Sequence, residues 1–117
     1  MIGVPAGARI LIAARPVDFR KGMDGLAALV QQTLQADPFA GDVFIFRAKR
    51  ADRVKILVYD GSGLVLYHKR LEANRFVWPP IRDGVLRLSN AQLSALLDGM
   101  DWKQVHGQVP PRPKTAC

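Results

Sequence analysis

The sequence is poor in the residues that build most metal and redox centres. It has one cysteine, Cys117, and two histidines, His68 and His106, among 117 residues. A single cysteine excludes a disulfide within this sequence and a zinc site built on cysteine pairs, and neither histidine has a cysteine or a carboxylate at metal-ligand spacing. We therefore expect no metal, no cofactor and no small-molecule substrate, and a reducing compartment such as the cytoplasm.

Long apolar runs are also missing. Arg, Asp or Gly interrupts each hydrophobic stretch within about ten residues, which is too short to span a bilayer as a helix. The apolar residues near the N-terminus have no basic segment before them, so the pattern argues against a signal peptide. The expectation is a cytoplasmic protein without a membrane partner.

Motifs of the common catalytic classes are absent too. No serine lies in a nucleophile-elbow pattern, and there is no G-x-x-x-x-G-K-[ST] loop for phosphate. Four carboxylates have the right chemistry for a metal-dependent nuclease, but their spacing does not group them: Asp18, Asp24, Asp52 and Asp60. We therefore predict that the protein is not an enzyme, with a metal-dependent nuclease as the weakest alternative.

Acidic residues are scarce relative to basic ones. The 17 Lys and Arg residues against 10 Asp and Glu residues give a formal net charge of +7, and most of this excess falls within residues 41–87. A basic excess concentrated in one stretch favours a polyanionic partner through long-range attraction. We therefore expect contact with nucleic acid, although the charges could instead only solvate the surface of a sheet.

The apolar pattern predicts an α+β fold in a single domain, residues 1–102, followed by a flexible, Pro-rich basic tail, residues 103–117. Short strands are expected over 8–14, 42–47 and 85–88, with a hairpin over 53–71 around "DGSG". We expect a mostly antiparallel sheet, whose central meander covers about residues 42–71, with two helices packed on one face.

Capping signals place the two helices. The first is expected from Asp24, as its N-cap, to about Ala36, before Asp37-Pro38. The second follows Ser89, which forms a capping box with Gln92. Its buried stripe is predicted to be Leu93, Leu96 and Leu97.

Two basic segments carry the strongest functional signal. The candidate contacts for nucleic-acid phosphates in "FRAKRADRVK" are Arg47, Lys49, Arg50, Arg53 and Lys55, and those in "YHKRLEANRFVW" are Lys69, Arg70 and Arg75. Guanidinium groups form bidentate hydrogen bonds with phosphate, and neighbouring aromatic rings can stack on bases. For the aromatic residues Tyr67, Phe76 and Trp78, burial in the core is the favoured interpretation over stacking.

The motifs "DFRKGMDGLA", "VFIFRAKRADRVKILVYDGSG", "LYHKRLE" and "RFVWP", in this order, carry a family resemblance. Over about residues 1–102 the sequence resembles the small accessory proteins of insertion sequence sixty-six elements, the Orf2-like family often labelled TnpB. It does not resemble the larger RNA-guided nucleases of the same label. The resemblance implies an accessory role in DNA transposition, with the element's transposase and DNA, such as the element ends, as partners. The alternative is a protein-interaction module that docks the transposase without touching DNA.

The segment "RKGMDG" matches the N-terminal motif of that family at Arg20, Lys21, Gly22, Asp24 and Gly25. Two interpretations of it stay open. Arg20 and Lys21 could join the free N–H groups of a helix N-terminus in binding a phosphate. Alternatively, Arg20 pairs with an acidic residue of the fold, and Gly22 only permits a tight entry into the helix.

Overall fold

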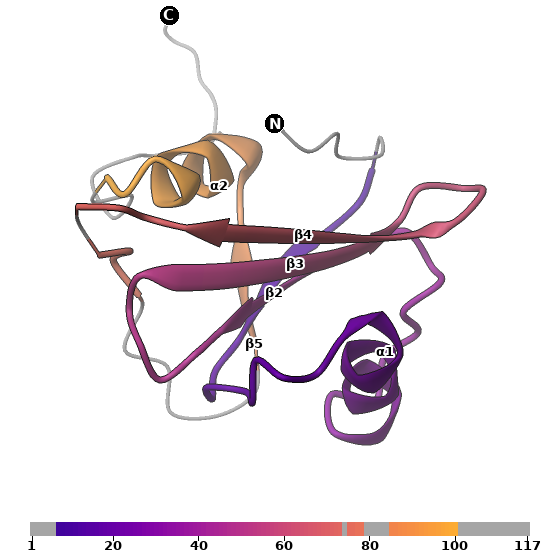
Figure 1. The fold of residues 1–117 in the computed structure, drawn as a ribbon. Coiled ribbons are helices and arrows are strands. Elements are labelled where there is room, and N and C mark those ends of the chain that lie inside the picture. The colour runs from indigo at the N-terminus through magenta and orange to yellow at the C-terminus, as the bar shows by residue number, and fades with distance from the viewer. Residues whose placement is uncertain (1–6, 74, 79–84, 101–117) are drawn as a thin grey trace, which may run out of the picture.

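The computed structural model describes residues 7–73, 75–78 and 85–100, so the predicted tail lies outside the described residues. Along the chain the elements are β1 (Ile10–Ala13), α1 (Met23–Gln32), β2 (Val43–Arg47), β3 (Arg53–Tyr59), β4 (Leu64–Arg70), β5 (Val85–Leu88) and α2 (Asn90–Leu97). The strands form one sheet in the order β4-β3-β2-β1-β5 (Figure 1). β1 and β2 are parallel and the other three pairings are antiparallel, which confirms the α+β, mostly antiparallel prediction.

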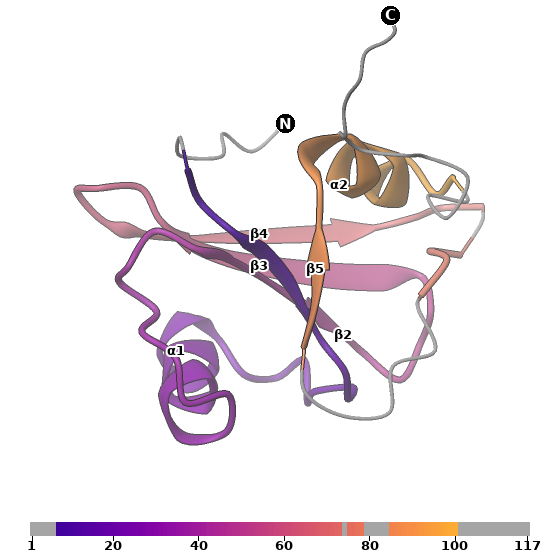
Figure 2. The ribbon, with the colours of Figure 1, turned by 180° about the vertical axis from the view of Figure 1, so that it is seen from behind.

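The prediction that both helices pack on one face of the sheet is wrong. α1 packs Leu26 and Val30 onto one face, and α2 packs Leu93 and Leu96 onto the other. Figures 1 and 2 show the sheet between the two helices from opposite sides. The physical reason is that the inner strands are apolar on both faces, so each face must be covered.

The meander over residues 42–71 does not lie wholly at the centre of the sheet. β2 and β3 are inner strands, but β4 forms an edge, and β2 occupies the middle position. The meander is off-centre because two further strands add to its β2 side. The α1 crossover lets β1 pair with β2 in parallel, and β5 pairs with the far side of β1. One edge of the sheet is therefore the exposed arm of the hairpin.

The predicted N-cap is correct for α2 but not for α1. Ser89 and Gln92 form the predicted capping box at α2, and Leu93, Leu96 and Leu97 are buried as expected. The prediction of Asp24 as N-cap is wrong, because α1 begins at Met23 with Gly22 as its N-cap and no capping bond from a side chain. Asp24 lies instead in the first turn, where its charge still faces the positive end of the helix dipole.

α1 also ends earlier than expected. It stops at Gln32, and the amide of Leu34 then donates to the carbonyl oxygen of Leu29. Gln35 adopts a left-handed conformation with φ of 52°. The chain therefore turns out of the helix before Asp37-Pro38 is reached.

The hairpin turn is built as the "DGSG" signal predicts. The Asp60 carboxylate accepts hydrogen bonds from the amides of Ser62 and Gly63, and these bonds lower its pKa. Gly61 has φ of 102°, a conformation that favours glycine. In β3, Val54, Ile56 and Val58 alternate along the strand and lie in the core beside α2.

Candidate nucleic-acid interface

The segments "RKGMDG" and "FRAKRADRVK" lie apart in the sequence but are neighbours in space. The loop before α1 (residues 14–22) and the loop between β2 and β3 (residues 48–52) are joined where the Val17 amide donates to the Arg47 carbonyl oxygen at 2.8 Å. A hollow of about 420 Å³ lies between them, lined by residues 16–19 and 48–50. The loop that carries Arg20 and Lys21 therefore lies beside the loop that carries Lys49 and Arg50.

A third cationic segment joins the same end of the sheet. The amide of Leu71 donates to the Asp52 carbonyl oxygen at 2.9 Å, and the amide of Phe76 donates to that of Ala51 at 2.8 Å. These bonds attach Leu71 and Phe76 to the loop between β2 and β3. We call the resulting set of cationic residues the basic surface: Arg20, Lys21, Arg47, Lys49, Arg50, Arg53, Arg70 and Arg75.

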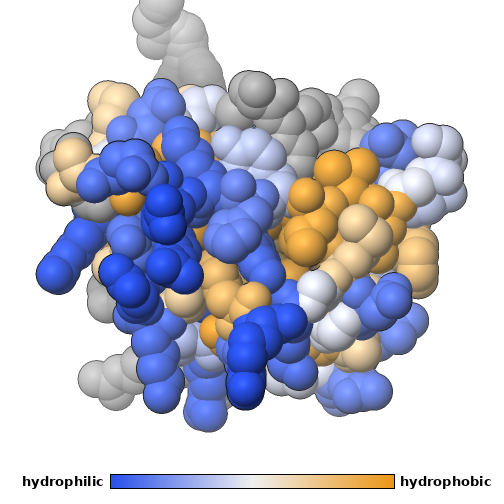
Figure 3. Space-filling view, in the orientation of Figure 1, coloured by the Kyte–Doolittle hydropathy of each residue, from blue (hydrophilic) through white to orange (hydrophobic). Residues whose placement is uncertain are grey.

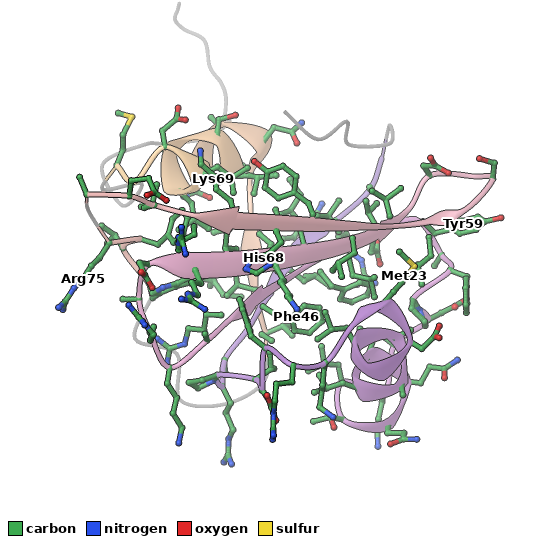
Figure 4. The ribbon with its side chains drawn as sticks, viewed as in Figure 1. Met23, Phe46, Tyr59, His68, Lys69 and Arg75 are labelled. Atoms are coloured by element: carbon green, nitrogen blue, oxygen red, sulfur yellow. The ribbon has the colours of Figure 1, made fainter. Side chains whose placement is uncertain are left out.

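The basic surface is well exposed at most of its positions. The Arg20 side chain is 91% exposed and that of Arg50 is 70% exposed, and Lys21, Lys49 and Arg75 are exposed as well. In Figure 3, hydrophilic side chains gather on the side of the molecule that holds the β2–β3 loop. Figure 4 shows Arg75 projecting outward at that side.

Lys55 belongs to the interior and not to this surface. Only 7% exposed, it lies on the face of β3 that α1 covers. Its ammonium donates to the carbonyl oxygens of Phe19 at 2.8 Å and Lys21 at 2.9 Å, and it lies 5.1 Å from the centre of the Phe19 ring. Lys55 therefore holds the loop before α1 against the sheet.

Lys69 has a similar structural position on the opposite face. Its ammonium donates to the Leu97 carbonyl oxygen at 2.8 Å, at the C-terminal end of α2. Cations stabilise that end of a helix because they bind its free carbonyl groups. Like Lys55, Lys69 is therefore engaged by the protein's own backbone.

Arg20 is paired within its own loop. Its guanidinium binds both carboxylate oxygens of Asp18, with a shortest contact of 2.7 Å, and the Arg20 amide donates to the same carboxylate. These hydrogen bonds lower the pKa of Asp18 to about 2. Of the two interpretations of "RKGMDG", this geometry matches the pairing of Arg20 with an acidic residue.

Lys21 and Gly25 fit together on the first turn of α1. A Cβ atom at Gly25 would lie 3.2 Å from the Cβ of Lys21. The missing side chain therefore leaves room for the aliphatic stem of Lys21, which directs this lysine along the helix.

Arg50, Arg53 and Arg70 form weaker ion pairs than Arg20 does. Asp52 lies 3.6 Å from Arg50 and 3.9 Å from Arg53, distances beyond those of good hydrogen bonds. Arg70 donates to Glu72 at 3.2 Å, in an exposed pair. Such surface pairs contribute little to stability.

The aromatic residues follow the core interpretation. Phe76 is buried, and Tyr67 and Trp78 pack against the cluster that α2 covers. The Trp78 indole N–H donates to the Ala51 carbonyl oxygen at 3.3 Å. Phe76 and Trp78 therefore support the loop between β2 and β3 from inside, through bonds to Ala51.

The acidic residues do not converge in the described part of the chain. Within it, no group of three or more His, Cys, Asp or Glu residues could hold a metal ion. Asp18 and Asp60 are each engaged in a local turn, as described above. Among the described residues there is also no helix of the length and apolarity needed to cross a membrane.

Comparison with known proteins places the chain in a family. Residues 8–107 match the profile of the IS66 Orf2 like protein family. The chain is 50% identical to the uncharacterized protein y4jC of Sinorhizobium fredii, with 97% of each chain covered, and 41% identical to y4hO of the same organism, with 94% of this chain and 96% of the relative covered. No solved structure matches it significantly. The chain therefore belongs to the IS66 Orf2-like family, which supports an accessory role in the transposition of an insertion sequence.

Proposed function

We propose that this chain assists transposition by binding the DNA backbone through its basic surface. The observation that carries the proposal is the joining of the two cationic loops by the hydrogen bond between Val17 and Arg47, which makes one surface of two separate motifs. Cations that neutralise phosphates release counterions, and this release is the main source of affinity in sequence-independent DNA binding. Contacts of this kind position a protein on DNA without reading its sequence.

The fixed backbone of these loops also supports the proposal. Lys55 holds the loop before α1, and bonds to Ala51 and Asp52 hold the loop between β2 and β3. A surface whose backbone is already ordered loses less conformational entropy when a ligand binds. Lys55 contributes to this order, and neither Lys55 nor Lys69 is among the proposed phosphate contacts.

Fluorescence anisotropy with labelled duplex DNA tests the proposal. Arg50→Ala removes one exposed cation from the basic surface, and Arg87→Ala, the matched control, removes one exposed cation from β5. For Arg50→Ala we expect a weaker affinity and a plot of log K against log[salt] that is shallower by about 0.9. Arg87→Ala should leave the slope unchanged. The same slope for both variants and the wild type would contradict the proposal.

The alternative function is docking of the transposase without contact to DNA. It is favoured by exposed apolar residues: Met23 is 37% exposed and Phe39 is 52% exposed, with the Phe39 ring edge-on to the Tyr59 ring at 5.8 Å between centroids. Figure 4 shows Met23 and Tyr59 toward the hairpin turn, on the opposite side of the view from Arg75. An exposed aromatic ring such as Phe39, in contact with Tyr59, suits a protein partner.

A competition experiment separates the two functions. The purified transposase is captured on this protein, and an excess of duplex DNA is added at constant salt. If the basic surface binds DNA, duplex should occupy it and compete with any acidic region of the transposase. A complex that is unaffected by duplex, together with no anisotropy change on labelled DNA, would favour the protein-only function.

A further inference from the structure

The hairpin brings like charges together at the basic end of the molecule. In the β3–β4 ladder, Arg53 faces Arg70, and Lys55 faces His68. Hydrogen-bonded pairs mark both ends of the ladder. The Leu71 amide donates to the Asp52 carbonyl oxygen at one end, and the Asp60 amide donates to the Gly63 carbonyl oxygen at the other. Because bonded and non-bonded pairs alternate in such a ladder, the Arg53–Arg70 and Lys55–His68 pairs both occupy non-bonded positions, where side chains are closest.

Like charges that face each other across two strands destabilise a sheet. In this ladder Arg53 and Arg70 repel each other. Both line a hollow of about 270 Å³, together with His68 and Glu72. An anion seated in the hollow would convert the repulsion into attraction.

The donors around the hollow are incompletely used. The Nε of Arg53 and the Oδ1 of Asp52 are both buried without a hydrogen-bond partner in the described part of the chain, and the two atoms lie 3.9 Å apart. Arg70 uses its Nε for Glu72. Two guanidinium groups with free donors match the geometry of a tetrahedral oxyanion better than a lysine would.

His68 completes the lining and is held in place by its neighbours. Its ring meets Phe19 edge-on at 5.6 Å between centroids. Partial burial and the charges of Lys55, Arg53 and Arg70 lower the pKa of His68, so that its ring is mainly neutral near pH 7. The carboxylate that lines the hollow is Glu72, and Asp52 lies beside Arg53.

We propose that this hollow binds one phosphate group of a nucleic-acid backbone between Arg53 and Arg70, and that His68 takes up a proton from solvent as the phosphate binds. The inference rests on the proposed function, because it names one phosphate position within the basic surface. The bound anion stabilises the imidazolium, and the imidazolium stabilises the anion. Affinity therefore increases as the pH falls. A rise of one unit in the pKa of His68 on binding corresponds to a gain of at most about tenfold.

Proton NMR of the imidazole signals tests the inference directly. The chain has two histidines, so His106 is an internal reference, and a His68→Gln variant assigns the signals. The pH titration of His68 is measured alone, with inorganic phosphate, and with a short duplex. We expect both phosphate and duplex to raise the pKa of His68. With inorganic phosphate, His106 should be unaffected.

Variants locate the effect. Arg70→Gln should abolish the shift of His68, whereas the matched control Arg87→Gln, an exposed arginine on β5 outside the basic surface and the hollow, should retain it. In anisotropy measurements between pH 5.5 and 8, the wild type should bind duplex more tightly at the lower pH, and His68→Gln should lose this gain.

The outcomes separate this inference from the proposed function. If duplex binds with the salt slope and variant effects expected above while the pKa of His68 stays constant, the phosphate position is wrong and DNA binding stands. If inorganic phosphate shifts His68 but duplex neither binds nor shifts it, nucleic acid is refuted as the source of the phosphate, and the proposed function fails with it. If phosphate and duplex both leave His68 unchanged, the hollow is not an anion site.

Discussion

Replacing Lys55 by Met distinguishes a structural lysine from a surface one. The substitution keeps the length and much of the apolar stem of the side chain. It removes the ammonium that donates to the carbonyl oxygens of Phe19 and Lys21 at 2.8 and 2.9 Å. We expect the loop before α1 to lose its attachment to β3, with a clear loss of stability.

The size of the loss follows from the two hydrogen bonds. A bond that involves a charged group contributes about 1.5–3 kcal/mol, and the removal of both is partly offset because the freed carbonyls can bind water and the Met side chain is apolar. We expect a net destabilisation of about 2 kcal/mol. For a domain of this size, that corresponds to a fall in Tm of about 8–16 °C.

Thermal unfolding followed by circular dichroism measures the effect, with Lys49→Met as the matched control. Lys49 is exposed in the neighbouring loop, so its replacement should change Tm by no more than about 4 °C. If Lys55→Met melts within about 2 °C of the wild type, the two carbonyl contacts do not hold the loop and the reasoning is refuted.

Three further predictions concern caps, titration and catalysis. Ser89→Ala should cost about 1 kcal/mol in a thermal melt, and Asp24→Ala should cost clearly less because Asp24 is not the N-cap; equal losses would contradict this. Asp18 should titrate at a pKa of about 2 by carbon NMR. Arg20→Ala should raise this pKa toward its ordinary value. Because folding depresses the Asp18 pKa, the stabilising effect of its ion pair is present above the ordinary pKa and is lost as the pH falls toward 2. The purified protein with magnesium or manganese should not cleave DNA. This prediction would be overturned by DNA cleavage that a single Asp→Asn change abolishes. The positions to change are Asp18, Asp24, Asp52 and Asp60.

Local elements were predictable where a few adjacent residues determine them. Asp60 makes its turn through bonds to residues two and three positions away, and Ser89 caps its helix with Gln92 three positions on. The placement of the helices depends on strand order, which is not local. The run Val43–Arg47 did carry a hint, because Phe44 and Phe46 on one face alternate with Val43 and Ile45 on the other, and all four are buried.

The roles of the basic residues were less predictable than their presence. The lysines that point inward bind backbone groups far away in the sequence, Lys55 with Phe19 and Lys69 with Leu97. Charge counting cannot separate such lysines from exposed ones, since every lysine has the same formal charge. The position of Lys55 between buried Val54 and Ile56 on an inner strand was the available signal.

The buried and the exposed cations depend on each other. Lys55 binds the carbonyl oxygens on both sides of Arg20, those of Phe19 and Lys21, and so fixes the backbone from which Arg20 and Lys21 project. A substitution at Lys55 should therefore weaken any ligand of this loop indirectly, together with a loss of stability. A substitution at Lys21 should weaken the same ligand without that loss, because its side chain is exposed. Binding and melting measured on the same variants thus separate residues that build the basic surface from residues that contact its ligand.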